Sequence, residues 1–139
     1  MKFLHTMIRV KNIEESMKFY TEVLDMKFDH KKRLEDCWLY FLTDADNTCQ
    51  IELTVNDETP ENGYNIGTGF GHFAFSVDSL DAFTAKIAKL GYDYLYPPFD
   101  LNGKGSKIAF INDPDGYEIE LIENCLLYTS PSPRDRSVS

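Results

Sequence analysis

The sequence predicts an α+β fold made of two similar βαβββ modules, because the same order of patterns occurs twice along its 139 residues. In each half, a short alternating strand precedes an amphipathic helix, and three further strand patterns follow that helix. The length and an apolar content of 42% suffice for a real core without disulfides. We expect one module over residues 1–62, a second over 63–124, and a tail over 125–139 outside the fold.

The opening strand assigns residues to two faces. Alternation places Leu4, Thr6, Ile8 and Val10 on one face and Phe3, His5, Met7 and Arg9 on the other. His5 and Arg9 therefore share a face, roughly 13 Å apart at about 3.3 Å per residue. That separation suits a ligand whose reacting end lies at His5 and whose remote anion lies at Arg9.

Both predicted helices have start signals and apolar stripes. Asn12 is a good N-cap with Glu15 three positions later, and the stripe that follows is Ile13, Met17, Tyr20 and Leu24. In the second module the stripe is Leu80, Phe83, Ile87 and Leu90. Gly91 then favours a left-handed helix end.

The later strands repeat one triplet and one type of turn. Ile-Glu-Leu occurs at 51–53 and again at 119–121, and each is preceded by an Asp-rich turn, at 44–47 and 113–116. Glu52 follows His5 by 47 positions, and Glu120 follows His72 by 48. Because the aliphatic neighbours face the helix, each half carries one His and one Glu on its opposite face.

These four residues predict a metal site. We expect His5, Glu52, His72 and Glu120 to hold one divalent ion, because imidazole and carboxylate together suit nickel, zinc, iron or cobalt. Four protein ligands leave two octahedral positions for water or substrate. Each residue taken singly is more often a solvated strand residue, and only the recurrence of the interval favours a site.

Composition excludes several function classes. A net charge of -9 argues against nucleic acid or an anionic membrane surface as partner. No apolar run is long enough for a membrane span or a signal peptide, so we expect a cytoplasmic protein. Cys37, Cys49 and Cys125 are scattered without a CxxC pair, which is typical of free thiols.

Other residues that could suggest a functional site have simpler structural interpretations. His30 lies in a His-Lys-Lys-Arg run and is assigned to a solvated basic patch. The glycines of 67–71 precede a strand rather than a helix, so a phosphate loop is not predicted. Trp38, Tyr40 and Phe41 are expected in the core or in a cleft wall.

Five segments resemble bacterial glyoxalase I of the vicinal oxygen chelate superfamily over residues 1 to about 124. They are Leu-His-Thr-Met-Ile-Arg-Val at 4–10, Phe-Tyr-Thr-Glu-Val-Leu at 19–24, Ile-Glu-Leu-Thr at 51–54, Gly-His-Phe-Ala-Phe-Ser-Val at 71–77 and Asp-Pro-Asp-Gly-Tyr-Glu-Ile-Glu-Leu-Ile at 113–122. The resemblance implies a homodimer in which paired modules form cleft sheets and each site draws ligands from both chains. All four ligand positions of that family are filled here.

The resemblance also implies an activity and further site residues. The substrate is the hemithioacetal of methylglyoxal and glutathione, which is isomerised through an enediolate to S-D-lactoylglutathione. Glu120 is the expected base, with Glu52 able to serve the opposite face of the substrate. Arg9 and Asn56 match glutathione contacts, and Lys104 and Lys107 lie where other members place cations. Short members resemble the nickel-activated class, so nickel is expected first and zinc second.

Two alternatives stay open at the level of sequence. Another enzyme of the superfamily, such as an acyl-CoA epimerase or a ring-cleaving dioxygenase, shares the fold but fills the ligand set differently, and Glu52 favours the isomerase. A non-catalytic protein that sequesters an antibiotic in the same dimeric cleft typically lacks the metal ligands.

Overall fold

The computed structural model describes residues 1–123. It contains two four-stranded sheets, each with its own helix, and confirms the predicted α+β class with paired βαβββ modules. The predicted tail, 125–139, lies outside the described residues. Across residues 1–123, every helix is too short or too polar to cross a bilayer.

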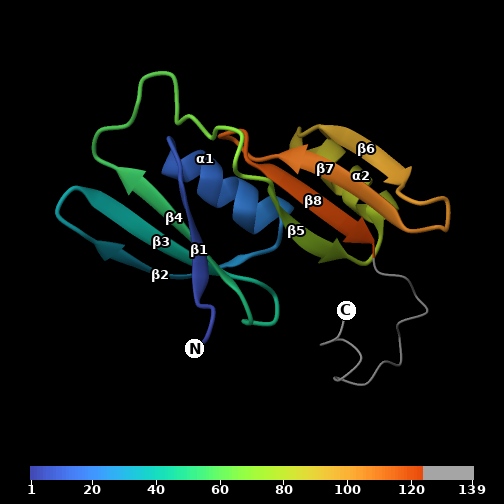
Figure 1. The fold of residues 1–139 in the computed structure, drawn as a ribbon, viewed down its shortest axis with the longest axis horizontal. Coiled ribbons are helices and arrows are strands. Elements are labelled where there is room, and N and C mark those ends of the chain that lie inside the picture. Colours follow the sequence, from blue (N-terminus) through green and yellow to red (C-terminus); the bar gives the residue numbers. More distant parts are fainter. Residues whose placement is uncertain (124–139) are drawn as a thin grey trace. The chain divides into compact units, whose positions relative to one another are not determined.

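The first module contains β1 (His5–Arg9), α1 (Ile13–Lys18), the π-helical turn η1 (Phe19–Val23), β2 (Lys27–Arg33), β3 (Cys37–Thr43) and β4 (Gln50–Asn56). Its strand order is β1-β4-β3-β2, as Figure 1 shows. β1 pairs with β4 in parallel, and the other two pairings are antiparallel. The first and last strands of the module are therefore neighbours in space.

The second module contains β5 (His72–Val77), α2 (Leu80–Leu90), β6 (Tyr96–Asp100), β7 (Lys107–Asn112) and β8 (Glu118–Glu123). Its order, β5-β8-β7-β6, repeats the arrangement of the first sheet. Ser79 caps α2 by accepting a hydrogen bond from Ala82 N, and Gly91 ends the helix at φ 87°. Leu80, Phe83 and Ile87 of the predicted stripe are buried.

Chain contacts divide the molecule into two compact units that do not coincide with a simple halving of the sequence. One comprises Met1–His72 with Asn112–Glu118, and the other comprises Phe73–Ile111 with the chain from Ile119. The module boundary predicted between residues 62 and 63 stays a prediction.

The first helix begins where the sequence predicts but buries a different stripe. The Asn12 side chain accepts a hydrogen bond from Glu15 N at 3.1 Å. The buried residues are Ser16, Phe19, Tyr20 and Val23, whereas Ile13, Met17 and Leu24 are half-buried. These buried residues follow ordinary helical spacing, at i, i+3, i+4 and i+7, so the segment buries a face next to the predicted one, and the π-helical turn, closed by Leu24 N on Phe19 O, ends it.

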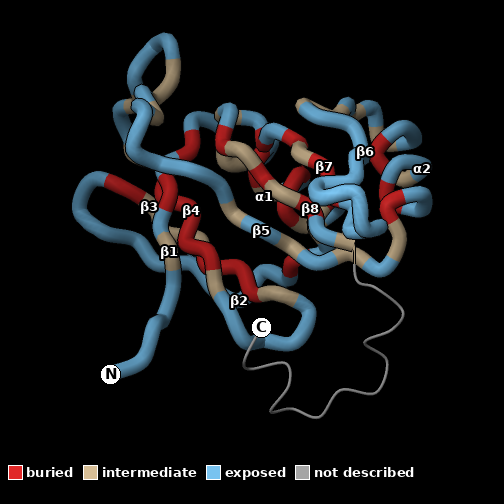
Figure 2. The backbone as a smooth tube through the Cα atoms, turned by 45° about the vertical axis from the view of Figure 1, so that its right-hand side comes forward, coloured by how far each residue is buried: buried red, intermediate tan, exposed pale blue. Residues whose placement is uncertain are grey.

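Burial in the first sheet is concentrated on its inner strands. Figure 2 shows buried backbone along β3 and β4, whereas β2 is exposed throughout its length. The aliphatic side chains of β1 and β4 are buried as alternation predicts, with Ile8 at 4% and Leu53 at 0% exposure. Unusually, the polar face of β4 is also buried at Glu52 and Thr54.

A turn after β7 belongs to the first unit and is held there by buried polar contacts. Asp113 Oδ2 accepts a hydrogen bond from Tyr20 OH at 2.7 Å, and its Oδ1 accepts bonds from the backbone N–H groups of Asp115 and Tyr117. Tyr117 OH in turn donates to Arg9 O at 2.8 Å. These bonds join the turn to η1 and to the end of β1.

The Asp113 carboxyl makes stability depend on pH. Burial raises the pKa of Asp113 to about 6, although the Tyr20 hydrogen bond lowers that pKa. A raised pKa means that the folded state holds the proton more tightly than the unfolded chain does. The stabilisation that comes from protonated Asp113 is therefore complete below pH about 4, which is the pKa of an Asp in the unfolded chain. This stabilisation is lost as the pH rises through about 6, the pKa of Asp113 in the folded protein.

We predict that Tyr20→Phe destabilises the protein more at pH 8 than at pH 5, because only at the higher pH is a buried Asp113 carboxylate left short of a donor. The expected loss at pH 8 is about 1–3 kcal/mol, measured by urea unfolding. Tyr94→Phe is the matched control, since the Tyr94 hydroxyl pairs with Thr84 rather than with a carboxylate. Equal losses for Tyr20→Phe at both pH values would contradict this account.

Candidate metal and substrate site

His5 and Glu52 meet on one face of the first sheet. Nε2 of His5 lies 2.9 Å from Oε1 of Glu52. The parallel register places Glu52 opposite Met7, two residues from His5, so all three side chains share a face. The Glu52 side chain is only 10% exposed, whereas the His5 side chain is 34% exposed. A buried carboxylate therefore lies next to an imidazole that is partly exposed to solvent.

Two neighbours fix the orientation of this pair. Thr54 Oγ1 donates a hydrogen bond to Oε2 of Glu52 at 2.8 Å. The Phe41 ring meets the His5 ring edge to face, with centroids 5.5 Å apart and an interplanar angle of 82°. Sequence reasoning placed Phe41 only in a core or cleft wall and missed Thr54. The available signal for Thr54 was its position two residues after Glu52, on the same strand face.

His30 also reaches this face, although β2 is exposed. Its ring stacks on Phe41 with centroids 4.4 Å apart and an interplanar angle of 8°. Its Nδ1 lies 2.6 Å from Asp29 Oδ2. The sequence correctly predicted that His30 is exposed to solvent, but it did not predict that the His30 ring stacks on Phe41.

A hollow of about 740 Å³ opens beside Glu52 on the same sheet. Its wall includes both residues that the sequence assigned to substrate binding in this module, Arg9 and Asn56, together with Thr54, Leu39 and Met7. Three further carboxylates line it, those of Asp36, Asp57 and Glu58. Arg9 is the cation in this lining and is the natural partner for an anionic group of a ligand.

Asn56 is oriented by a residue that the sequence gave no reason to select. Its Nδ2 donates a hydrogen bond to Tyr64 OH at 2.9 Å. Tyr64 lies in the segment between β4 and β5, where no periodicity links it to Asn56. With its N–H group engaged, Asn56 can present its oxygen to a ligand in the hollow.

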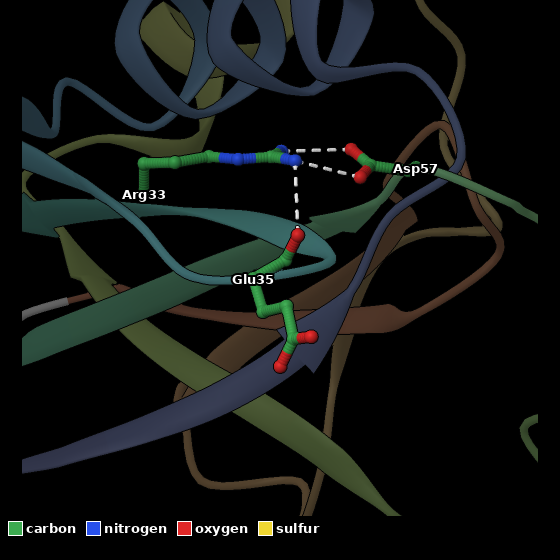
Figure 3. A network of polar contacts seen from close by, with 3 residues as sticks. All are labelled: Arg33, Glu35 and Asp57. Carbon is green, nitrogen blue, oxygen red and sulfur yellow. Dashed lines mark hydrogen bonds and ion pairs between the residues drawn. The ribbon is translucent and has the colours of Figure 1, made fainter.

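An exposed ion pair ties the turn after β2 to the end of β4, next to the hollow. The Arg33 guanidinium donates two hydrogen bonds of 2.7 Å to the Asp57 carboxylate and one of 3.3 Å to Glu35 O, as Figure 3 shows. This pairing lowers the pKa of Asp57. Asp57 is therefore ionised and already paired, so it is a poor acceptor for a ligand cation.

Cys37 is the thiol in the wall of the hollow. It is 7% exposed, and burial together with the Asp36 carboxylate raises its pKa. A protonated, buried thiol is a weak nucleophile. Cys37 thus acts as an apolar wall residue and is not expected to react with an electrophilic substrate.

The remaining predicted site residues lie in the strands and one loop of the second module. His72 begins β5 and is exposed, and Glu120 is half-buried in the adjacent strand β8. Lys104 lies in the loop between β6 and β7, and Lys107 begins β7; both are exposed. Within residues 1–123, no three His, Cys, Asp or Glu side chains form a group that could hold a metal ion. The convergence of all four ligands, and the roles of both lysines, stay predictions.

The His5–Glu52 pair fits as two of the four predicted protein ligands of one metal ion. Ligand atoms about 2.1 Å from one ion and at right angles to each other are about 3 Å apart, close to the observed 2.9 Å. Imidazole and carboxylate are also the donors expected for nickel or zinc. The hydrogen bond from Thr54 and the aromatic contact from Phe41 are supporting interactions that metal sites commonly have.

Comparison with known proteins identifies the family. Residues 2–121 match the model of the Glyoxalase/Bleomycin resistance protein/Dioxygenase superfamily. The chain belongs to this superfamily. It is 39% identical to a lactoylglutathione lyase of Escherichia coli O157:H7, over 88% of this chain and 93% of that protein. The resemblance to bacterial glyoxalase I is thereby confirmed.

Two plant relatives are longer than this chain. A lactoylglutathione lyase of Arabidopsis thaliana is 37% identical over 88% of this chain, which spans only 44% of the plant protein. The crystal structure of glyoxalase I from Zea mays superposes with a TM-score of 0.78 at 34% identity, again over 88% of this chain and 44% of that one.

We predict that His5→Ala weakens binding of nickel by about 10–100-fold or more, because it removes a donor from the site. Affinity is measured by competition with a chromophoric chelator. His30→Ala is the matched control, since His30 shares the sheet face but contacts Phe41 and Asp29 instead of Glu52. Wild-type affinity in the His5 variant would remove His5 from the ligand set.

Proposed function

We propose that this chain is a lactoylglutathione lyase that isomerises the hemithioacetal of methylglyoxal and glutathione to S-D-lactoylglutathione. The observation that carries the proposal is the His5–Glu52 pair beside a hollow lined by Arg9 and Asn56. Similarity to lactoylglutathione lyases over 88% of the chain supports the same reaction. We also propose a cytoplasmic location, because a reducing compartment keeps free thiols such as those of Cys37 and Cys49 reduced.

The proposed reaction moves hydrogen between neighbouring carbons without net oxidation. The C–H bond at the hemithioacetal carbon breaks, and a new C–H bond forms at the adjacent carbonyl carbon. The hydroxyl proton moves between the two oxygens, so the alcohol carbon becomes the thioester carbonyl. One carboxylate near both carbons can take the proton and return it. We assign that role to Glu120 and retain Glu52 as a base for the opposite face.

The remaining residues bind and orient the substrate. The Arg9 guanidinium pairs with a carboxylate of the glutathione moiety, and the Asn56 oxygen accepts a hydrogen bond from one of its N–H groups. Met7 and Leu39 exclude water from the hollow between these groups and Glu52. Lys104 and Lys107 are the proposed partners of the other glutathione carboxylate.

We propose a divalent ion, nickel first and zinc second, as the cofactor held by His5, Glu52, His72 and Glu120. Such an ion would stabilise the negative charge that develops on the two substrate oxygens when the C–H proton leaves. We further propose that the active form is a homodimer. In it, His5 and Glu52 of one chain complete a site with His72 and Glu120 of the other.

Activity assays on the purified protein separate this proposal from other activities of the superfamily. Thioester formation from the hemithioacetal in the presence of nickel is expected. Turnover only with ferrous iron, dioxygen and a catechol would instead indicate a ring-cleaving dioxygenase. Antibiotic binding without turnover would indicate a sequestering protein.

We predict that Glu120→Gln lowers kcat by about 10²–10⁴-fold, because the amide cannot accept the proton. The measurement is thioester formation at saturating nickel, with bound nickel determined in parallel so that loss of metal is not mistaken for loss of the base. Glu118→Gln, on the same strand, is the control and should retain activity. Full activity in the Glu120 variant would refute its role as the base.

We predict that Arg9→Ala raises KM for the glutathione hemithioacetal by about 10–100-fold and leaves kcat little changed, because it removes a charge-assisted contact remote from the reacting carbons. Steady-state kinetics check this. Lys2→Ala, an exposed cation outside the hollow, should have no effect. An unchanged KM in the Arg9 variant would remove Arg9 from the substrate site.

A further inference from the structure

Both oxygens of the Glu52 carboxylate already have a defined neighbour on the polar face of the first sheet. Oε1 lies 2.9 Å from His5 Nε2, and Oε2 accepts the hydrogen bond of 2.8 Å from Thr54 Oγ1. Thr54 is 4% exposed and Glu52 is 7% exposed, so water does not compete effectively for this bond. The carboxylate therefore has one oxygen directed at His5 and the other held away from it.

We propose that Thr54 is a positioning residue that makes Glu52 a ligand through one oxygen only and makes Glu52 a weaker base than Glu120. This inference rests on the proposed metal site. A carboxylate free to rotate could bind an ion through both oxygens or turn toward the substrate. The Thr54 hydroxyl opposes both motions, because either one would break a buried hydrogen bond.

The two modules differ at this point. Glu52 and Glu120 hold corresponding places in the repeated Ile-Glu-Leu triplets, and two residues further on the sequence has Thr54 in one module and Ile122 in the other. An isoleucine side chain has no hydroxyl to donate, and Ile122 is 40% exposed. The Thr54 tether is thus absent from the corresponding position of the second module. The difference concerns this one hydroxyl donor, and it distinguishes the surroundings of Glu52 from those of Glu120 at that position.

A purely structural hydrogen bond is the competing explanation, because any buried carboxylate needs donors. The two explanations predict different results for a variant without the hydroxyl. A structural bond affects the stability of the protein without metal but leaves the affinity of the folded protein unchanged. A positioning bond changes metal affinity and the ligand field around the ion.

The test replaces Thr54 by Val, which has nearly the same shape but no hydroxyl, and by Ser, which keeps the hydroxyl. We expect Thr54→Val to weaken nickel binding about 10–100-fold and to change the visible spectrum of the cobalt-loaded protein. Thr54→Ser should bind nickel nearly as the wild type does. Thr6→Val is the control, because Thr6 lies on the opposite face of β1. If Thr54→Val does not fold, Thr54→Ala takes its place.

Wild-type nickel affinity and an unchanged cobalt spectrum in the Val or Ala variant would overturn the proposal. The restraint on base activity has its own measurement, in which Thr54→Val is combined with Glu120→Gln at saturating nickel. Residual turnover should rise several-fold above that of Glu120→Gln alone, and an unchanged value would refute the restraint. Failure of the metal site itself gives a different result, since His5→Ala and Glu52→Gln would then leave nickel binding unaltered.

Discussion

The parallel pairing of β1 with β4 is the constraint on which the site depends. It joins the first strand of the module to the last and brings the polar faces of both onto one surface, where His5 and Glu52 lie 2.9 Å apart. A carboxylate buried at that place is costly unless it is paired. His5 and Thr54 provide the partners, so the fold and the proposed chemistry require the same contacts.

The turn that precedes β8 also holds β1 in place, through hydrogen bonds to the end of β1 and to the segment that follows it. Tyr117 donates to the carbonyl oxygen of Arg9, and Asp113 accepts from Tyr20 of the helical segment that follows β1. Asp115 adds a bond of 2.9 Å from the Lys11 N–H group. The residue proposed to bind the glutathione carboxylate is therefore fixed through its own backbone. Substrate binding at Arg9 should consequently be sensitive to changes in this turn.

The pattern of alternation predicted which side chains share a face, and the register confirms it for His5, Arg9 and Glu52. Periodicity succeeds there because strand geometry is local. It was less successful for the first helix, where burial has helical spacing but falls on Ser16, Phe19 and Val23 instead of most of the predicted stripe. Contacts set by strand register or by irregular segments, such as His30 on Phe41 or Tyr64 on Asn56, have no periodic signal. The roles of His72 and Glu120 rest on the duplication and on family resemblance.

The central claim is that two ligands from one chain and two from its partner complete each site. Co-expression of His5→Ala and Glu120→Gln chains with different tags, followed by isolation of the mixed dimer, tests this claim most directly. One of the two sites in the mixed dimer then keeps all four residues. At a nickel concentration that loads only intact sites, the mixed dimer should therefore have about half of the wild-type activity, although each homodimer is inactive. A mixed dimer of His5→Ala and Glu52→Gln should stay inactive, since both sites are damaged. An inactive His5→Ala/Glu120→Gln dimer would contradict the account.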